Sequence, residues 1–403
     1  MTSFDSTPPL SVWRALLALA VVFVMLATTG WTTLHNQRNT SSPLRTALAA
    51  WERGHINGHR LPDPSASPTR LAHFFGSLTP HQRTRLATRY PLVVGNMNGA
   101  PVKLRYRANH IALDSARKLE RRRMHDSRLS PSGQHDAGRR MHRFEALMRP
   151  GRHILAFDPT GSGRVAEVLG DLNRAQHVSV VVPGIDTDLL TFQRTYRKYS
   201  APLGMARALY DAERSASTRA RVAVIAWADY TAPSGLGVEA ATATRAKDGA
   251  VRLNALLRAL PGTSRVALYC HSYGSVLCGV AAHSVPRRVS DIAVAGSPGM
   301  RADSVSQLHT GARVWATRDG DDWIGDVPHL EVGGIGHGAD PVSSAFGARV
   351  LSARGAKGHA GYFEPGTESL TNFAEIGIGS YLGVRCASGD DGCRSGLSGG
   401  TTA

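Results

Sequence analysis

The sequence is poor in acidic residues and in cysteine. Asp and Glu total 31 against 47 Lys and Arg, which gives a formal net charge of +16. No recognition helix, zinc-ligand spacing or interleaving of aromatic and basic residues accompanies this charge, so a nucleic-acid groove is not expected. The four cysteines include no CxxC pair, and no internal repeat is visible.

One stretch lacks charge altogether, and it lies near the start of the chain. Residues 15–27 are apolar and uncharged, and Trp13 and Trp31 bracket them at about the spacing of two membrane interfaces. This pattern predicts a membrane-targeting segment over residues 1–31. No convincing small-x-small cleavage site follows Leu26, which favours an uncleaved single-pass anchor and leaves a removed signal peptide as the alternative. We therefore expect the body of the protein outside the cytoplasm, at the cell membrane or secreted if the segment is cleaved.

Changes in composition divide the rest of the chain into four expected parts. Proline-broken polar sequence predicts a linker, and helix formers with clustered arginines predict a helical basic region containing a flexible insertion at 126–138. We interpret the basic clusters as a solvated face or linker biased by GC-rich coding, with attraction to anionic lipid or cell wall as the alternative. The expected parts are a linker over 32–70, a helical basic region over 71–150, an α/β domain over 151–382 and a flexible tail over 383–403.

Short apolar runs separated by helical segments follow residue 151. Residues 154–158 and 164–169 read as a hairpin, and a helical stretch is expected over 189–216. A mostly parallel sheet with helices on both faces is the fold class that this alternation predicts. The further strands are expected at 177–185, 222–227, 266–269, 291–296 and 313–317.

Ser272 stands where the strand 266–269 breaks into small residues. A serine at a sharp strand-to-helix turn presents its hydroxyl above the sheet, and the pattern that forms this nucleophile elbow is G-x-S-x-G. Here Cys270 replaces the first Gly. Cysteine is still small, so the turn is crowded but not excluded. We expect Cys270 and Cys278 to pack rather than to pair, whereas Cys386 and Cys393 either form a local disulfide or remain free thiols.

A serine nucleophile needs a base and an acid, which follow it in the order Ser, acid, His in this arrangement. Asp322 is the favoured acid, because the apolar residues after it would hold its loop; Asp319 and Asp321 are alternates. His359 is the favoured base, with His337 and His329 as alternatives. A metal site built from these histidines is disfavoured because their spacing matches no standard ligand motif.

The oxyanion of an acyl-transfer reaction needs two preorganised amides. One is expected from Tyr273, the residue after the nucleophile. The other is expected from Ile185, with Gly184 as its neighbour, because Pro183-Gly184 at the end of an apolar strand brings the backbone close.

These motifs, together with Ala-Gly-Ser-Pro-Gly299 and Gly95-Asn-Met-Asn-Gly99, carry a family resemblance. The chain resembles the α/β-hydrolase superfamily over about residues 150–375. Within it, the chain is similar to a bacterial group defined as a domain of unknown function, common in high-GC Gram-positives. The resemblance implies a Ser272-Asp322-His359 hydrolase without metal or organic cofactor.

The substrate class that follows is an ester or related acyl bond of a small or lipid-like molecule. An acyltransferase and a non-catalytic envelope scaffold that keeps the fold are the alternatives. Residues 71–150 and the 229–240 loop are the candidates for a lid over the site.

Overall fold

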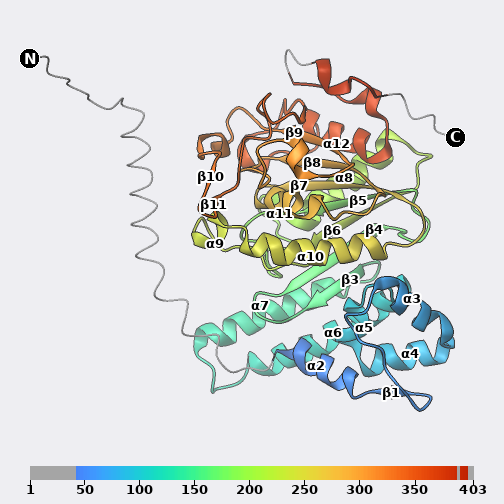
Figure 1. Ribbon diagram of the computed structural model, residues 1–403. Helices are drawn as coiled ribbons and strands as arrows, with labels where there is room; N and C mark the ends of the chain where they lie inside the picture. Colours follow the sequence, from blue (N-terminus) through green and yellow to red (C-terminus); the bar gives the residue numbers. More distant parts are fainter. Residues whose placement is uncertain (1–41, 388–390, 398–403) are drawn as a thin grey trace, which may run out of the picture.

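An eight-stranded sheet forms the centre of the computed structural model, which describes residues 42–387 and 391–397 (Figure 1). The strand order is β12-β9-β8-β7-β5-β6-β4-β3. Only β4 runs against its neighbours, pairing antiparallel with both β3 and β6. The expected mostly parallel sheet and its hairpin are therefore confirmed. The strands are β3 His153–Asp158, β4 Arg164–Gly170, β5 His177–Val182, β6 Val222–Ala228, β7 Arg265–His271, β8 Val289–Ala295, β9 Arg313–Thr317 and β12 Arg349–Val350.

Helices cover both faces of this sheet. Consecutive residues of β5 point to opposite sides: Val180 belongs to the core under α10 (Thr244–Ala259) and α11 (Tyr273–Ala282), and Val181 to the core under α8 (Pro202–Ala216) and α12 (Glu368–Ile378). Both valines are fully buried. A strand covered on both sides favours apolar residues at nearly every position, which explains the valines of β5. Ser179 is the buried exception, and its hydroxyl donates to the buried Glu213 carboxylate.

The first part of the described chain is a helical region with its own core. It comprises α2 Pro43–Glu52, α3 Pro68–Ser77, α4 Pro80–Arg89, α5 Pro91–Asn96, α6 Val102–Arg123 and α7 Pro131–Leu147. The expected linker over 32–70 is wrong for the described residues, because Trp51 is fully buried and its Nε1–H donates to the Pro62 carbonyl at 2.7 Å. The flexible insertion at 126–138 is also wrong, since α7 begins at Pro131. Proline occupies the first turn of α2, α3, α4, α5 and α7, where its missing N–H costs nothing, and it caps α6 at Pro101, so it starts these helices instead of breaking the chain.

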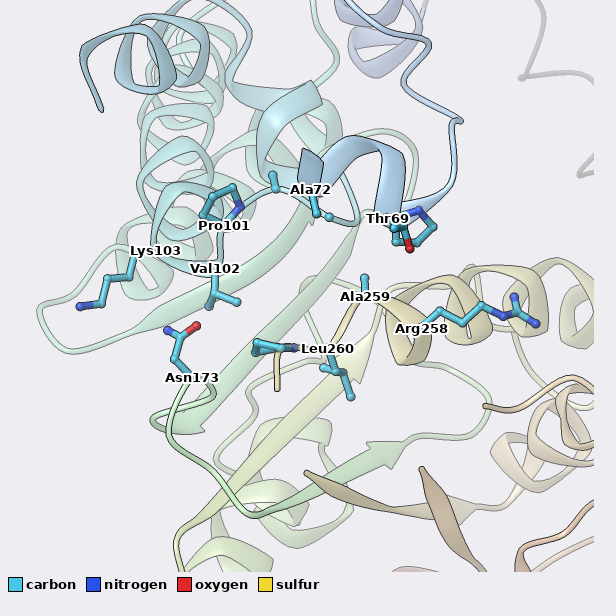
Figure 2. Close-up of a pocket in the computed structure, with 13 residues that line it drawn as sticks. Thr69, Ala72, Pro101, Val102, Lys103, Asn173, Arg258, Ala259 and Leu260 are labelled. Atoms are coloured by element: carbon cyan, nitrogen blue, oxygen red, sulfur yellow. The ribbon is translucent and has the colours of Figure 1, made fainter. Parts of the chain in front are cut away.

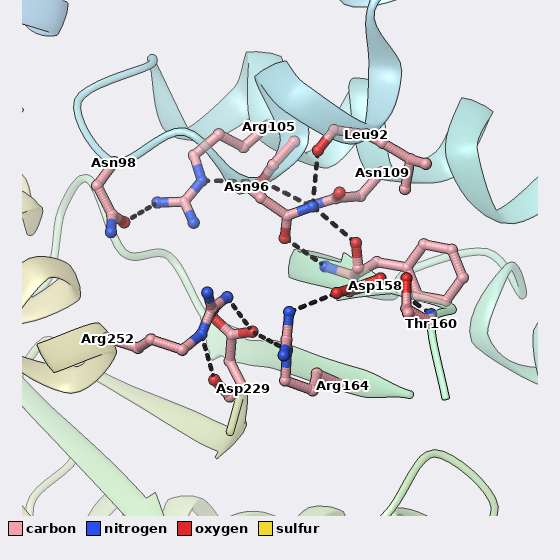
Figure 3. A network of polar contacts seen from close by, with 12 residues as sticks. Leu92, Asn96, Asn98, Arg105, Asn109, Asp158, Thr160, Arg164, Asp229 and Arg252 are labelled. Atoms are coloured by element: carbon pink, nitrogen blue, oxygen red, sulfur yellow. Dashed lines mark hydrogen bonds and ion pairs between the residues drawn. The ribbon is translucent and has the colours of Figure 1, made fainter. Parts of the chain in front are cut away.

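Asn96 attaches the helical region to the edge strand β3 (Figure 3). Its side chain accepts from the Phe157 N–H at 2.9 Å and donates to the Phe157 carbonyl at 2.7 Å, as a neighbouring strand would. Asn109 donates to the Ile154 carbonyl at 2.9 Å and to the Gly95 carbonyl at 3.0 Å. Asn96 of the Gly-Asn-Met-Asn-Gly segment and Asn109 of α6 thereby satisfy backbone groups of the edge strand, which would otherwise invite pairing with another chain.

Two more expectations need correction. The helix expected over 189–216 begins only at Pro202, because the residue before a proline is kept extended and Arg197 adopts a left-handed conformation. The tail expected to be flexible is partly packed: Cys386 and Cys393 form a disulfide, and the Cys393 carbonyl accepts from Arg349 at 2.6 Å.

The segment predicted to target a membrane, residues 1–31, lies outside the described residues. Within 42–387 and 391–397, no helix is long and apolar enough to span a bilayer.

Candidate active site

Ser272 forms the sharp turn between β7 and α11. Its backbone has φ 55° and ψ −129°, a conformation that a residue with a side chain adopts only under strain. Gly274 makes the turn possible, because a Cβ there would lie 2.4 Å from the Val182 carbonyl oxygen. The strand, turn and helix expected around Ser272 are therefore present, with the serine 6% exposed.

The elbow carries a disulfide, contrary to expectation. Cys270, at the end of β7, is bonded to Cys278 in α11, with their Cα atoms 6.4 Å apart. The two cysteines lie on either side of the turn and face the same core, so packing and pairing occur together. Cysteine at the position usually held by Gly thus ties the strand to the helix.

The loop after β5 lies directly against Ser272. A Cβ on Gly184 would be 2.6 Å from the Ser272 Cβ and 2.9 Å from its Oγ, so only glycine fits. The Tyr230 hydroxyl fixes this loop by donating to the Pro183 carbonyl at 2.7 Å. Among the described residues, the amides of Ile185 and Tyr273 have no hydrogen-bond acceptor. The expected oxyanion donors therefore lie at the elbow with their N–H groups unused.

Asp322 and His359 are hydrogen-bonded to each other. His359 Nδ1 lies 2.9 Å and 3.1 Å from the two carboxylate oxygens of Asp322. Asp322 follows β9 as the cap of a short 3₁₀ turn, and its Oδ1 accepts from the Ile324 N–H at 3.0 Å. Because Nδ1–H donates to the carboxylate, Nε2 of His359 is left as the ring's free acceptor.

Tyr362 also contacts the Asp322-His359 pair, a contact that the sequence pattern does not predict. Its hydroxyl donates to Asp322 Oδ2. Burial by itself would raise the pKa of Asp322, but the hydrogen bonds from His359 and Tyr362 outweigh it and hold the pKa below the usual value. Asp322 is therefore an ionised carboxylate facing a histidine.

His271, the residue before Ser272, contacts the loop that carries His359. Burial lowers the pKa of His271 to about 3, so the ring is neutral, and its Nε2–H donates to the His359 carbonyl at 2.6 Å. Asp319, an alternate acid from the sequence, accepts from the Gly358 N–H at 2.7 Å and supports the same loop. Both residues position His359 through its backbone.

The other alternates do not take part in the Asp322-His359 pair. Asp321 is exposed, and His329 is 3.8 Å from Asp340. His337 is buried, and its Nε2–H donates to the Ala240 carbonyl at 2.7 Å. In the part of the chain that the structure describes, no three His, Cys, Asp or Glu side chains are arranged to hold a metal ion.

Ser272 and His359 lie at adjoining strand ends. The Ser272 N–H donates to the Ala295 carbonyl at 3.0 Å, and a Cβ on the next residue, Gly296, would lie 3.0 Å from His359 Nδ1. Between these two side chains no hydrogen bond is formed in the described structure. Such bonds are often long without substrate and tighten in the reaction complex.

A pocket of about 340 Å³ opens beside His359, lined among others by Arg197, Trp323 and Lys357. Larger hollows lie away from the site. The one in Figure 2, about 630 Å³, separates Thr69 and Pro101 of the helical region from Arg258 at the end of α10. It contains neither Ser272 nor His359, whereas His359 lines the smaller pocket.

Residues 158–332 match a family model described as alpha/beta hydrolase, a range that includes Ser272 and Asp322. An uncharacterized protein of Mycobacterium tuberculosis is 26% identical over 379 residues, covering 79% of this chain and 57% of that protein. An uncharacterized protein of Mycobacterium bovis is 31% identical over 168 residues, covering 40% and 62%. The chain thus spans less than two thirds of the length of these relatives.

Two solved structures resemble the fold. Dienelactone hydrolase from Anabaena variabilis is 16% identical with a TM-score of 0.34, over 55% of this chain and 93% of that one. A serine hydrolase without a lid from Xanthomonas campestris is 15% identical with a TM-score of 0.29, over 44% and 74%. At these scores the likeness does not bear on the activity of this chain.

Proposed function

We propose that this chain, whose residues 158–332 belong to the α/β-hydrolase family, is a serine hydrolase that cleaves an ester or related acyl bond. The observation that carries the proposal is the strained elbow at Ser272 beside a hydrogen-bonded Asp322-His359 pair. A backbone at φ 55° is costly, and strain of this kind persists where the surrounding structure imposes it.

Each residue has a role in the proposed reaction. His359 Nε2 takes the proton of Ser272 as Oγ attacks the acyl carbon, and the ionised Asp322 stabilises the imidazolium. The amides of Tyr273 and Ile185 stabilise the oxyanion. The tetrahedral intermediate then expels the alcohol, which receives the proton from His359. Water repeats the sequence on the acyl-enzyme, releasing the acid and free Ser272.

The disulfides support a proposal for the location, and the location suggests the class of substrate. Two disulfides, Cys270–Cys278 and Cys386–Cys393, favour an oxidising compartment, as expected for a body outside the cytoplasm. A small-molecule or lipid-like acyl ester fits that placement. Acyl transfer would use the same residues with an alcohol in place of water, and product analysis with an added alcohol would distinguish it.

Fluorophosphonate labelling tests the proposal directly. We expect the full chain to be labelled, Ser272→Ala to be unlabelled, and the exposed control Ser306→Ala to be labelled like the parent. An unlabelled parent protein, or equal labelling of Ser272→Ala, would mean a non-catalytic protein that keeps the fold. Hydrolysis of p-nitrophenyl esters of increasing chain length would then define the acyl preference.

A further inference from the structure

Exposed apolar side chains gather on two neighbouring loops. The first, residues 234–242, contains α9 (Val238–Ala241), and the second, residues 329–337, contains the hairpin β10 (Glu331–Val332) and β11 (Ile335–Gly336). We call these two segments the apolar loop pair. Its exposed members are Leu236 (71%), Val238 (54%), Leu330 (52%), Val332 (70%) and Ile335 (60%).

The two loops form one surface. Thr242 and Ile335 make an antiparallel bridge, and His337 donates to the Ala240 carbonyl at 2.7 Å. Figure 1 shows α9 next to β10 and β11 at one end of the sheet. Soluble proteins leave single apolar side chains exposed everywhere, but a contiguous group at one place indicates a partner.

This surface adjoins the candidate active site. Tyr273, directly after the nucleophile, donates from its hydroxyl to the Thr242 carbonyl at 2.7 Å, and its ring lies 5.7 Å from that of His337. Trp323 is 42% exposed, with its ring 5.0 Å from the His359 ring. Exposed apolar groups therefore lie near both Tyr273 and His359.

Cationic side chains border the Trp323 side. Arg197, Lys198 and Lys357 are exposed, and within the described residues none has a carboxylate within 4.0 Å. Glu364 is the carboxylate that lines the pocket with Arg197 and Lys357. Asp319, which accepts from the Gly358 N–H, and the exposed Asp321 lie on the neighbouring loop, but neither forms an ion pair with these three cations, which remain able to bind an anionic group.

The two carboxylates of the apolar loop pair, by contrast, are neutralised by arginines next to it. Glu239 is 2.5 Å from Arg245, and Glu331 pairs with Arg301. Around the site the surface of the described chain thus offers exposed apolar side chains without a free charge, and three cations without ion-pair partners.

We propose that this face docks onto an anionic lipid surface. The apolar loop pair would enter the boundary between headgroups and acyl chains, and Arg197, Lys198 and Lys357 would bind anionic headgroups. A bilayer fits better than a protein partner because the apolar side chains lie on two separate loops and the three cations are exposed without carboxylate partners in the described structure. Docking in this orientation would present lipid-borne acyl esters to the pocket beside His359, and the docking itself does not require catalysis.

Hydrogen exchange with mass spectrometry tests the proposal on the full chain carrying Ser272→Ala. Because residues 15–27 are predicted to bind membranes by themselves, the readout is local protection and not co-sedimentation. We expect vesicles of phosphatidylcholine mixed with phosphatidylglycerol to slow exchange several-fold in peptides covering 234–242 and 329–337, and to leave α10 peptides unchanged. Vesicles of phosphatidylcholine alone should protect much less.

The double variant Val332→Asp/Ile335→Asp should lose this protection, whereas the control Val251→Asp, 72% exposed on α10, should keep it. In the Ser272 background, fluorophosphonate labelling of the double variant should be unchanged, so that lost docking and a lost site are distinguishable. Retained protection in the double variant would overturn the proposal. Equal protection by both vesicle types would overturn the proposal that the lipid surface must be anionic. Protection that rises with protein concentration in the absence of vesicles would show that a second copy of the chain binds this face.

Discussion

Polar groups are buried both at the carboxyl-terminal edge of the sheet, where Ser272 follows β7, and at the edge strand β3. They have hydrogen-bond partners at β3, but some lack them around Ser272 within the described residues. At β3, the side chains of Asn96 and Asn109 satisfy the backbone groups of Phe157 and Ile154. At the elbow, Ser272 is strained and neighbouring amides have no acceptor within the described chain. A satisfied network stabilises a junction, whereas strain combined with unused donors indicates a place prepared for a ligand.

The largest expected effect is at the Asp322-His359 pair. Asp322→Asn keeps the shape but donates to His359 instead of accepting, which favours the wrong tautomer, so kcat should fall by about 10⁴-fold. Steady-state hydrolysis of p-nitrophenyl acetate measures this change. Asp321→Asn, at the exposed neighbouring position, should retain activity, and a similar loss in both variants would argue against the role of Asp322.

A substitution at Gly184 tests whether activity depends on the close approach of this loop to Ser272. Gly184→Ala places a methyl group 2.6 Å from the Ser272 Cβ and displaces the loop that carries the Ile185 amide, so activity should fall by about 10²-fold. Gly311→Ala, where a Cβ meets nothing within 4 Å, is the matched control. Unchanged activity in Gly184→Ala would remove Ile185 from the proposed oxyanion site.

The two disulfides close loops of similar length, 8 and 7 residues apart in sequence, in different places. Removing either by a double Cys→Ala change should lower the free energy of unfolding by roughly 2–3 kcal/mol, which denaturant titration measures. Only loss of Cys270–Cys278 should also slow fluorophosphonate labelling, by about tenfold, because it frees the strand and helix that hold Ser272. Equal slowing by both changes would contradict a local effect at the elbow.

The smallest effect is expected at the β3 edge. Asn96→Ala leaves the Phe157 N–H and carbonyl without partners, so the free energy of unfolding should fall by about 1–3 kcal/mol and the Phe157 amide should exchange faster. Ester hydrolysis should be unchanged under folding conditions. Asn173→Ala, at an exposed position, is the control. Loss of activity in folded Asn96→Ala would show that the two edges are coupled.

Much of the fold was predictable, because strands covered on both faces require continuous apolar runs such as 177–182. The errors came from local signals with two meanings. Pro43 and Pro68 lie in sequence that predicts a linker, although both begin helices. The polar composition of 126–138 predicts a flexible insertion, although Ser130 caps α7 by accepting from the Gly133 N–H.

For the candidate site, the sequence by itself determined the residue types and their order: a serine at a strand end, then an acid, then a histidine. Only the tertiary structure decided that His359 and not His337 contacts Asp322, that Tyr362 and His271 support the pair, and that Cys270 is bonded to Cys278. The physical reason is that strand-end turns can be read from local patterns. Contacts between loops 37 or 88 residues apart depend on which strand ends the sheet brings together.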